Sequence, residues 1–363
     1  MPKKFLYLRN GIFALLLMMA AVLVSSTPAF AQDVSFKGKT VRVLLNLGAK
    51  SAVSANYAVF APFIAKYLPG KPKIFVESKP GGQGILGAAY LYKNVKPDGE
   101  TMGTFAIISG YTVSGKKLPI DLNNFTYIGS TGQGTIVYAR TDSGLKSAED
   151  FVNPPKPIIL GMTNPNATLI LQVKVFLNGI GQKDKYKSIA GYRGMLGLLQ
   201  AARSGEVNVT IMHAGQFFPR MEGFKKEGII VPLMELGVVD KDGVIHGTKG
   251  AGVPTVDAVW RKMAPNTLKN AEYEVFRVLQ LSKAISWLHA LPPNTPEKYR
   301  KAWEEAIAAA SKDPEYLALL AKRNAPPARF TDGETTRSML SQIATKMKEP
   351  AVRDAIEAVF VKK

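Results

Sequence analysis

The chain has 363 residues, is 46% hydrophobic, and carries 47 Lys and Arg against 28 Asp and Glu, a formal net charge of +19. This length suits two domains of roughly 100–200 residues, and the hydrophobic content excludes a disordered chain. The absence of cysteine excludes disulfides and thiolate chemistry. The basic residues are scattered and lack the aromatic interleaving of a nucleic-acid groove, which favours attraction of small carboxylates. A solvated basic surface with no bearing on function is the alternative.

The N-terminal segment has the pattern of a secretory signal peptide covering residues 1–31. Three basic residues within the first nine precede the apolar run Ile12–Val24, and Ala29-Phe30-Ala31 forms a small-x-small cleavage site. A retained membrane anchor is the alternative, but the run is shorter than the ~20 residues that span a bilayer. We therefore expect a periplasmic protein, whose charge falls to +16 once the three basic residues of the signal are removed.

The first part of the expected mature chain alternates strand-type and helix-type patterns. Apolar, β-branched runs predict strands at 41–45, 74–76 and 101–106, and helical patterns follow at 55–68 and 85–94. Strands that alternate with helices indicate a parallel sheet, whose ligands bind in loops at the carboxyl ends of the strands.

The glycine-rich turn Lys79–Gly84, which follows the second of these strands, is the strongest candidate for a ligand contact. Glycines at 81, 82 and 84 allow positive φ and close approach of a bound group, and the next helix points its first N–H groups the same way. An anion would fit there. The turn is not a Walker loop, because no Gly-Lys-Ser/Thr follows. A tight corner without a ligand is about equally consistent with these residues alone.

A second alternating series predicts a second α/β lobe. The glycine-laced segment 129–134 is expected to cross between lobes, and Asn166 is a candidate N-cap for the first helix of the second lobe. The residues from Asn270 onward are expected to be helical, and no internal repeat stands out. The expected strands are 125–128, 135–139, 158–160, 186–189, 207–211 and 229–233, and the expected helices 167–177, 195–203, 272–289, 296–311, 314–323, 335–347 and 350–361.

The side chains available for chemistry favour binding over catalysis. The three histidines show no metal-binding spacing and no Gly-x-Ser-x-Gly elbow is present, so we expect no metal, no cofactor and no enzyme. His213 could line the crevice, although a loop role fits it better. Several polar residues on loops and helix starts could together hold a carboxylate. These are Ser51, Ser54, Asn56, Ser109, Thr163, Asn164, Asn166 and Thr168.

The order and spacing of several short motifs resemble the tripartite tricarboxylate transporter solute-binding proteins, also called the Bug family of periplasmic receptors. The motifs are Tyr67-Leu68-Pro69-Gly70, Val76-Glu77-Ser78-Lys79-Pro80-Gly81-Gly82, Ala88-Ala89-Tyr90-Leu91-Tyr92, Pro97-Asp98-Gly99-Glu100-Thr101, Phe125-Thr126-Tyr127-Ile128-Gly129, Gly191-Tyr192-Arg193-Gly194, Gly252-Val253-Pro254-Thr255 and Leu291-Pro292-Pro293-Asn294-Thr295-Pro296.

The resemblance implies a type 2 periplasmic-binding-protein fold, in which each of two hinged lobes is a mixed sheet flanked by helices, with a helical C-terminal tail. Lobe 1 would comprise 33–132 and 253–363, and lobe 2 would comprise 133–252. The protein would be a monomer that captures a small organic carboxylate and hands it to integral membrane transporter subunits. The implied ligand-binding residues are Gly48, Ser51, Ser54, Asn56, Gly81, Gly82, Gln83, Ser109, Asn164, Asn166, Thr168, Tyr192 and Met195.

The chain departs from the family pattern at five positions. Ala52 and Val53 replace glycines, Asn56 and Asn208 replace aspartates, and Phe60 replaces an arginine. Bulkier residues hinder close backbone approach, and lost acids remove acceptors near the expected cleft. The ligand could therefore differ from the family's di- and tricarboxylates. An extracytoplasmic sensor that signals to a membrane kinase is the alternative function.

Overall fold

The computed structural model describes residues 34–106, 118–165 and 167–359. The predicted signal segment, Ser109 and Asn166 therefore lie outside the described residues, as do the side chains of Ala52, Val53 and Gln83. Within the described ranges, no helix is both long and apolar enough to cross a membrane. Within Phe36–Lys363, one contiguous unit, the described residues form two large sheets.

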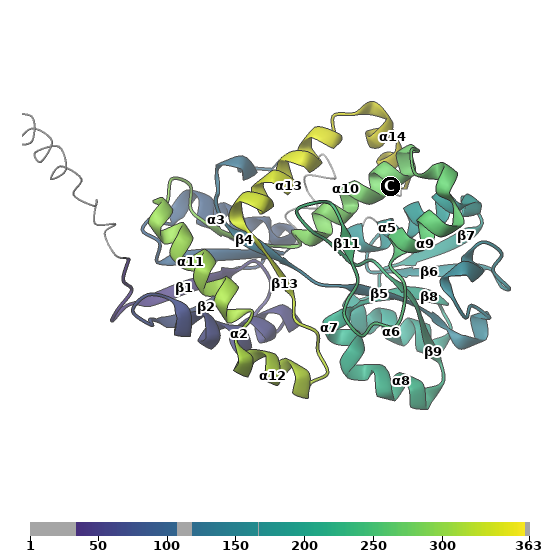
Figure 1. Cartoon of the computed structure of the whole chain (residues 1–363), viewed down its shortest axis with the longest axis horizontal. Coiled ribbons are helices and arrows are strands. Elements are labelled where there is room, and N and C mark those ends of the chain that lie inside the picture. The colour runs from purple at the N-terminus through teal and green to yellow at the C-terminus, as the bar shows by residue number, and fades with distance from the viewer. Residues whose placement is uncertain (1–33, 107–117, 166, 360–363) are drawn as a thin grey trace, which may run out of the picture. The chain divides into compact units, whose positions relative to one another are not determined.

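The first sheet has the strand order β13-β4-β12-β3-β1-β2 (Figure 1). Its strands β1, β2 and β3 are mutually parallel neighbours, as predicted, whereas β12 pairs antiparallel with both β3 and β4. The strand bounds are β1 Thr40–Leu45, β2 Lys73–Ser78, β3 Thr101–Ala106, β4 Thr126–Gly132, β12 Trp287–Leu291 and β13 Arg329–Asp332.

The second sheet has the order β7-β6-β8-β5-β9. Here β6 lies parallel to β7 and β8, and β5 is antiparallel to β8 and β9. A short hairpin, β10 Val238–Val239 with β11 Ile245–His246, follows this sheet. The remaining bounds are β5 Thr135–Arg140, β6 Ile158–Met162, β7 Tyr186–Ala190, β8 Val209–His213 and β9 Ile230–Glu235.

The two sheets repeat one unit, which the sequence did not reveal. The unit β1-α2-β2-α3-β3 of the first sheet has the same strand pairing as β6-α5-β7-α6-β8 of the second. No repeat stands out in the sequence, because the recurrence lies in the pairing of strands more than in residue identity. The helices are α2 Ala52–Tyr67, α3 Ile85–Asn94, α5 Thr168–Leu177 and α6 Gly194–Ser204.

The prediction of an all-helical tail was wrong at two strands. Residues 287–291 form β12 in the middle of the first sheet, and β13 adds an edge strand. The run Trp287–Leu291 continues an apolar helical pattern without a breaker, so only pairing with β3 and β4 identifies it as a strand. The helices that the tail does form are α9 Val256–Met263, α10 Ala271–Ala284, α11 Glu297–Ala310, α12 Pro314–Lys322, α13 Gly333–Lys346 and α14 Pro350–Val359.

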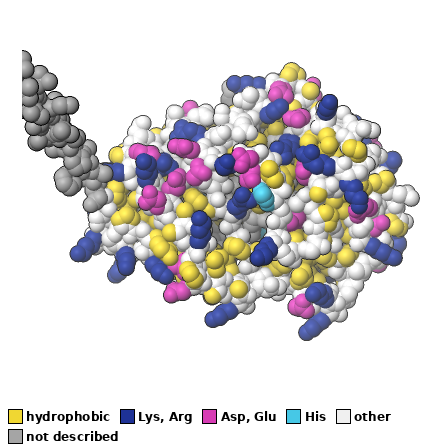
Figure 2. Space-filling view, viewed as in Figure 1, with side chains coloured by type: hydrophobic (Ala, Val, Ile, Leu, Met, Phe, Trp, Pro, Cys, Tyr) yellow, Lys and Arg dark blue, Asp and Glu magenta, His cyan; other side chains and the backbone are white. Residues whose placement is uncertain are grey.

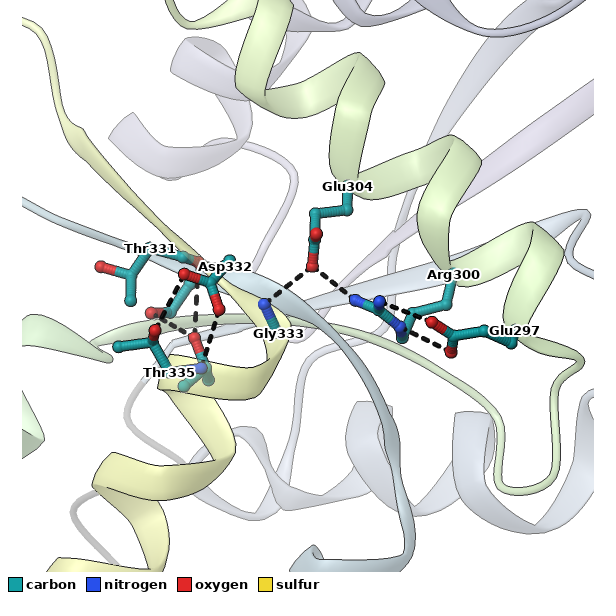
Figure 3. Close-up of polar contacts among 9 residues, drawn as sticks. Glu297, Arg300, Glu304, Thr331, Asp332, Gly333 and Thr335 are labelled. Atoms are coloured by element: carbon teal, nitrogen blue, oxygen red, sulfur yellow. Dashed lines mark hydrogen bonds and ion pairs between the residues drawn. The ribbon is translucent and has the colours of Figure 1, made fainter. Parts of the chain in front are cut away.

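Buried aromatic rings and charged caps hold these helices in place. Trp260 of α9 packs against Phe176 of α5 and Phe276 of α10, so α10 lies beside a helix of the second sheet's repeat unit. At the other end of the tail, the Asp332 side chain caps α13 and Glu304 of α11 accepts from the Gly333 N–H at 2.9 Å (Figure 3). The predicted lobe boundaries near 132 and 253 stay a prediction.

Candidate functional site

The chain crosses between the two sheets at the edge where the parallel strands of each sheet end. Gln133–Gly134 joins β4 to β5, a shorter crossing than the predicted 129–134 because β4 extends to Gly132. Ala106, the last residue of β3, pairs with Trp287 beside this crossing, and His213, the last residue of β8, pairs with Thr135. The loops after β1, β2, β6 and β7 therefore belong to two carboxyl edges that meet the same crossing, where open α/β sheets bind ligands.

The loop after β1 is shaped by its own serines. Ser51 is the N-cap of α2, and its hydroxyl oxygen accepts from the Ser54 N–H at 3.2 Å. The Ser54 hydroxyl in turn donates to the Gly48 carbonyl at 2.9 Å. These two predicted ligand residues thus have structural hydrogen bonds, while Asn56 is exposed one turn further along α2.

Asn46, which the sequence reasoning did not single out, links three segments of the first edge. Its buried side-chain amide donates to the Gly84 carbonyl at 3.1 Å and to the Ala106 carbonyl at 2.8 Å, and its oxygen accepts from the Ala106 N–H at 3.0 Å. The end of β1 is thereby tied to the glycine turn and to the end of β3. A polar residue directly after the apolar run Val43–Leu45 was the available signal.

The glycine turn after β2 has the backbone that the sequence predicted. Gly81, Gly82 and Gly84 have φ values of 129°, 53° and 94°, and residues 82–84 form a single 3-10 turn that opens α3. A side chain at Gly84 would place its Cβ 2.5 Å from the Asn46 amide nitrogen. Gly82 is exposed, so its backbone can be approached closely by a bound group.

The second edge carries the remaining predicted contacts. The Met162 carbonyl at the end of β6 accepts from the Tyr192 N–H at 3.4 Å, which brings the two second-edge loops together, and the Tyr192 hydroxyl donates to Glu206 at 3.0 Å. Thr168 opens α5 and Met195 lies in the first turn of α6; both are half-buried, while Asn164 is exposed.

The predicted N-cap of α5 was displaced by one residue. Its N-cap is Ala167, which makes no side-chain capping bond.

Three ionisable side chains from different strands and helices gather beside the crossing. Half-buried His213 lies 3.3 Å from the Thr135 hydroxyl, and burial, aided by the nearby Lys283, lowers the pKa of its imidazole to about 4. Buried Lys283 donates to the Gln133 carbonyl at 2.5 Å and to the Gly237 carbonyl. Burial lowers the Lys283 pKa to about 7 and raises that of Glu235. His213 is the half-buried last residue of β8, and its contact with a bound solute stays a prediction.

Two departures from the family pattern have structural explanations. Phe60 is buried against Tyr316, with ring centroids 4.8 Å apart, so it fills the core beneath α12. Asn208 accepts from the Ile159 N–H at 2.7 Å and donates to the Pro157 carbonyl at 2.8 Å, at the amino ends of β6 and β8. The expectation that Asn208 removes an acid near the cleft was wrong, because these strands end at the opposite edge.

Replacing Asn208 with alanine is expected to lower the free energy of unfolding by about 1 kcal/mol, because the half-buried Ile159 N–H loses its acceptor, whereas the Pro157 carbonyl belongs to an exposed residue and can turn to water. Solute affinity should stay unchanged, since the residue lies at the edge away from the candidate site. Urea unfolding and calorimetry on the same variant separate the two effects. Weakened binding at unchanged stability would place Asn208 in the site after all.

The described residues offer little for other kinds of chemistry. No group of three or more His, Asp and Glu side chains among them is arranged to hold a metal ion. Lys and Arg side chains are spread among acidic ones over the visible face and do not gather in one patch (Figure 2).

No protein-family model matches the chain, and no curated protein matches its sequence. Solved structures do match its fold. A TctC solute-binding protein from Polaromonas is 16% identical with a TM-score of 0.64, over 89% of this chain and 100% of that one. A Rhodopseudomonas palustris protein with adipate is 14% identical with a TM-score of 0.59, over 88% and 97% of the two chains. MatC from Rhodopseudomonas palustris with bound malate is 15% identical with a TM-score of 0.57, over 87% and 98%.

These likenesses show that the chain has the two-lobed fold of the periplasmic solute-binding proteins. Within that class it shares the architecture of the TctC-type proteins of tripartite tricarboxylate transporters, so the fold that the sequence motifs implied is confirmed.

Proposed function

We propose that this protein is a periplasmic solute-binding protein that captures a small organic carboxylate between its two lobes and delivers it to a tripartite tricarboxylate-type membrane transporter. The observation that carries the proposal is the pair of carboxyl edges that meet at the crossing, one of them bearing the glycine turn that Asn46 holds in place. Closure of the lobes around the solute would come from contacts made only in the closed state.

Several further features support this function. Two of the similar proteins described above hold malate and adipate, both carboxylates. The net charge, +19 for the full chain and +16 without the signal segment, attracts anions over long range, and the N-terminal signal pattern suits export. Hydroxyl and amide side chains on loops and helix starts suit reversible capture of a carboxylate. We propose that the protein acts as a monomer without a cofactor.

The proposed ligand residues belong to both edges. Gly81, Gly82 and the loop from Gly48 to Ser54 would hold one carboxylate through backbone N–H groups, and the Tyr192–Met195 turn would cover the rest of the solute. Ser51 and Ser54 would act mainly by fixing the loop, because their hydroxyls already bond within it.

Calorimetry on protein stripped of carried-over ligand by unfolding and refolding tests the proposal. Titration with citrate, malate, adipate and benzoate should reveal saturable binding of at least one of them, with a matching rise in the melting temperature. A panel that produces no heat and no thermal shift, on protein with native circular dichroism, would contradict the proposed function.

Replacing Gly82 with valine should abolish this binding. Its φ of +53° strains any residue with a side chain, and the new Cβ would lie 2.8 Å from the Ile85 methyl Cγ2, so the turn must move. The matched control is Gly228→Val, which has a φ of +64° and open space around it, and which precedes the amino end of β9. Both variants should lose about 1–2 kcal/mol of stability, but only Gly82→Val should lose binding, as the same titration will show. Equal affinity in the two variants would remove the turn from the site.

A further inference from the structure

The two repeat units carry the same pattern, Gly-x-Leu-Gly, at the same position. Residues 84–87 read Gly-Ile-Leu-Gly and residues 194–197 read Gly-Met-Leu-Gly. Each tetrapeptide follows the edge strand of its sheet, β2 or β7, and begins the helix that returns to the parallel strands. The first glycine of each tetrapeptide has a positive φ, +94° at Gly84 and +63° at Gly194. The backbone therefore turns into α3 and into α6 in a similar way.

The leucine of each tetrapeptide is exposed although its neighbour is packed. Ile85 and Met195 are half-buried against the hydrophobic core, whereas Leu86 and Leu196 expose 55% and 53% of their surface. A single exposed leucine is ordinary on a protein surface. Two that recur at equivalent places in two lobes, each at the carboxyl edge that borders the candidate site, require a common explanation.

Leu86 directly borders the turn assigned to the carboxylate. A Cβ at Gly81 would lie 2.6 Å from the Leu86 methyl Cδ1, and one at Gly82 would lie 3.4 Å from its Cγ. The leucine therefore lies over the glycine turn, and any group held there has an aliphatic side chain as its neighbour.

We propose that Leu86 and Leu196 contact the body of the bound solute from opposite lobes, and that the solute is consequently a carboxylate whose body is hydrocarbon and not hydroxylated. This inference rests on the proposed function and narrows its ligand class. Burying the two leucines against hydrocarbon is favourable, whereas a hydroxyl facing them in a closed cleft would lose its hydrogen bonds to water. Direct contact of the two leucines with each other on closure is the competing arrangement.

Matched pairs of acids separate these possibilities. Succinate and tartrate, adipate and galactarate, and benzoate and gallate share a carbon skeleton within each pair and differ in hydroxyl groups. Calorimetry on ligand-stripped wild-type protein should find its tightest binder among succinate, adipate and benzoate, at least tenfold tighter than its hydroxylated partner. A hydroxylated acid as the tightest binder would overturn the inference while leaving the proposed function standing. No binding by any of the six would count against the proposed function first.

Leucine variants then assign the contact. Leu86→Ser and Leu196→Ser should each weaken binding of the tightest acid about tenfold and reduce its preference over the hydroxylated partner. The control Val152→Ser removes a side chain that is 48% exposed and precedes the amino end of β6, and it should leave affinity unchanged. If the variants weaken both members of the pair equally, the leucines contact each other and not the solute, and the assignment of the ligand class fails.

Discussion

Replacing Asn46 with alanine is expected to lower the free energy of unfolding by about 3 kcal/mol and to abolish solute binding. The side chain is 1% exposed and makes three hydrogen bonds with backbone groups of Gly84 and Ala106. Its removal leaves those groups without a partner, at a cost of roughly 1–3 kcal/mol for each buried group that water does not reach. Urea unfolding measures the loss of stability.

The binding loss has a separate cause. Without the amide, the glycine turn loses its bonds to Asn46 and, through it, to Ala106, and the Lys79 N–H bond to the Leu45 carbonyl at 2.7 Å holds only the start of the turn. The two loops that would share the carboxylate therefore no longer hold a fixed spacing. The control is Asn94→Ala, an exposed asparagine at the end of α3, which should change neither quantity. A stable, folded Asn46→Ala protein with wild-type affinity would show that the turn is positioned by something else.

Replacing His289 with glutamine is expected to make the protein less sensitive to acid. His289 lies in β12, 1% exposed, with its ring nitrogens 3.0 Å from the Thr104 hydroxyl and 3.2 Å from the Thr131 hydroxyl. Burial lowers its pKa from 6.5 to about 3. Between pH 6.5 and pH 4.5 the unfolded chain therefore binds a proton that the folded protein does not, and stability falls as the pH falls.

The size of this effect follows from the width of the window. The histidine should cost the wild-type protein about 2 kcal/mol between pH 6.5 and pH 4.5, a cost that glutamine does not share. Urea unfolding gives the change in the free energy of unfolding between the two pH values for each protein. Subtracting the change in the glutamine variant from that in the wild type leaves the contribution of His289, because the other titrating groups contribute equally to both. Parallel losses in the two proteins would show that His289 takes up its proton normally in the folded state.

The sequence predicted the repeat units of the fold well, one by one. The strands β1, β2 and β3, with the glycine turn between β2 and α3, lie where the apolar runs and the Pro-Gly-Gly punctuation indicated. Local sequence patterns suffice to locate these elements because glycine or proline residues mark where they begin or end. The equivalence of the two units could not be predicted from local patterns. It consists of the order in which strands pair, and those strands are far apart in the sequence.

Sequence-based predictions were wrong or incomplete where contacts between distant segments determine the structure. The sequence predicted a helix through His289. In the structure Trp287–Leu291 is a central strand, so His289 lies in the sheet. Asn46 had no partners to suggest its role, since Gly84 and Ala106 lie 38 and 60 residues away. Asn208 was expected near the ligand because only its neighbours in sequence were known, and the strand direction places it at the other edge.

Mass spectrometry of the small molecules released when the purified protein is denatured tests the central claim most directly. A protein that closes on an organic carboxylate should release one carboxylic acid at a stoichiometry approaching one per chain, and the Gly82→Val variant, purified in the same way, should release none. A neutral sugar or an amine released at that stoichiometry would contradict the account.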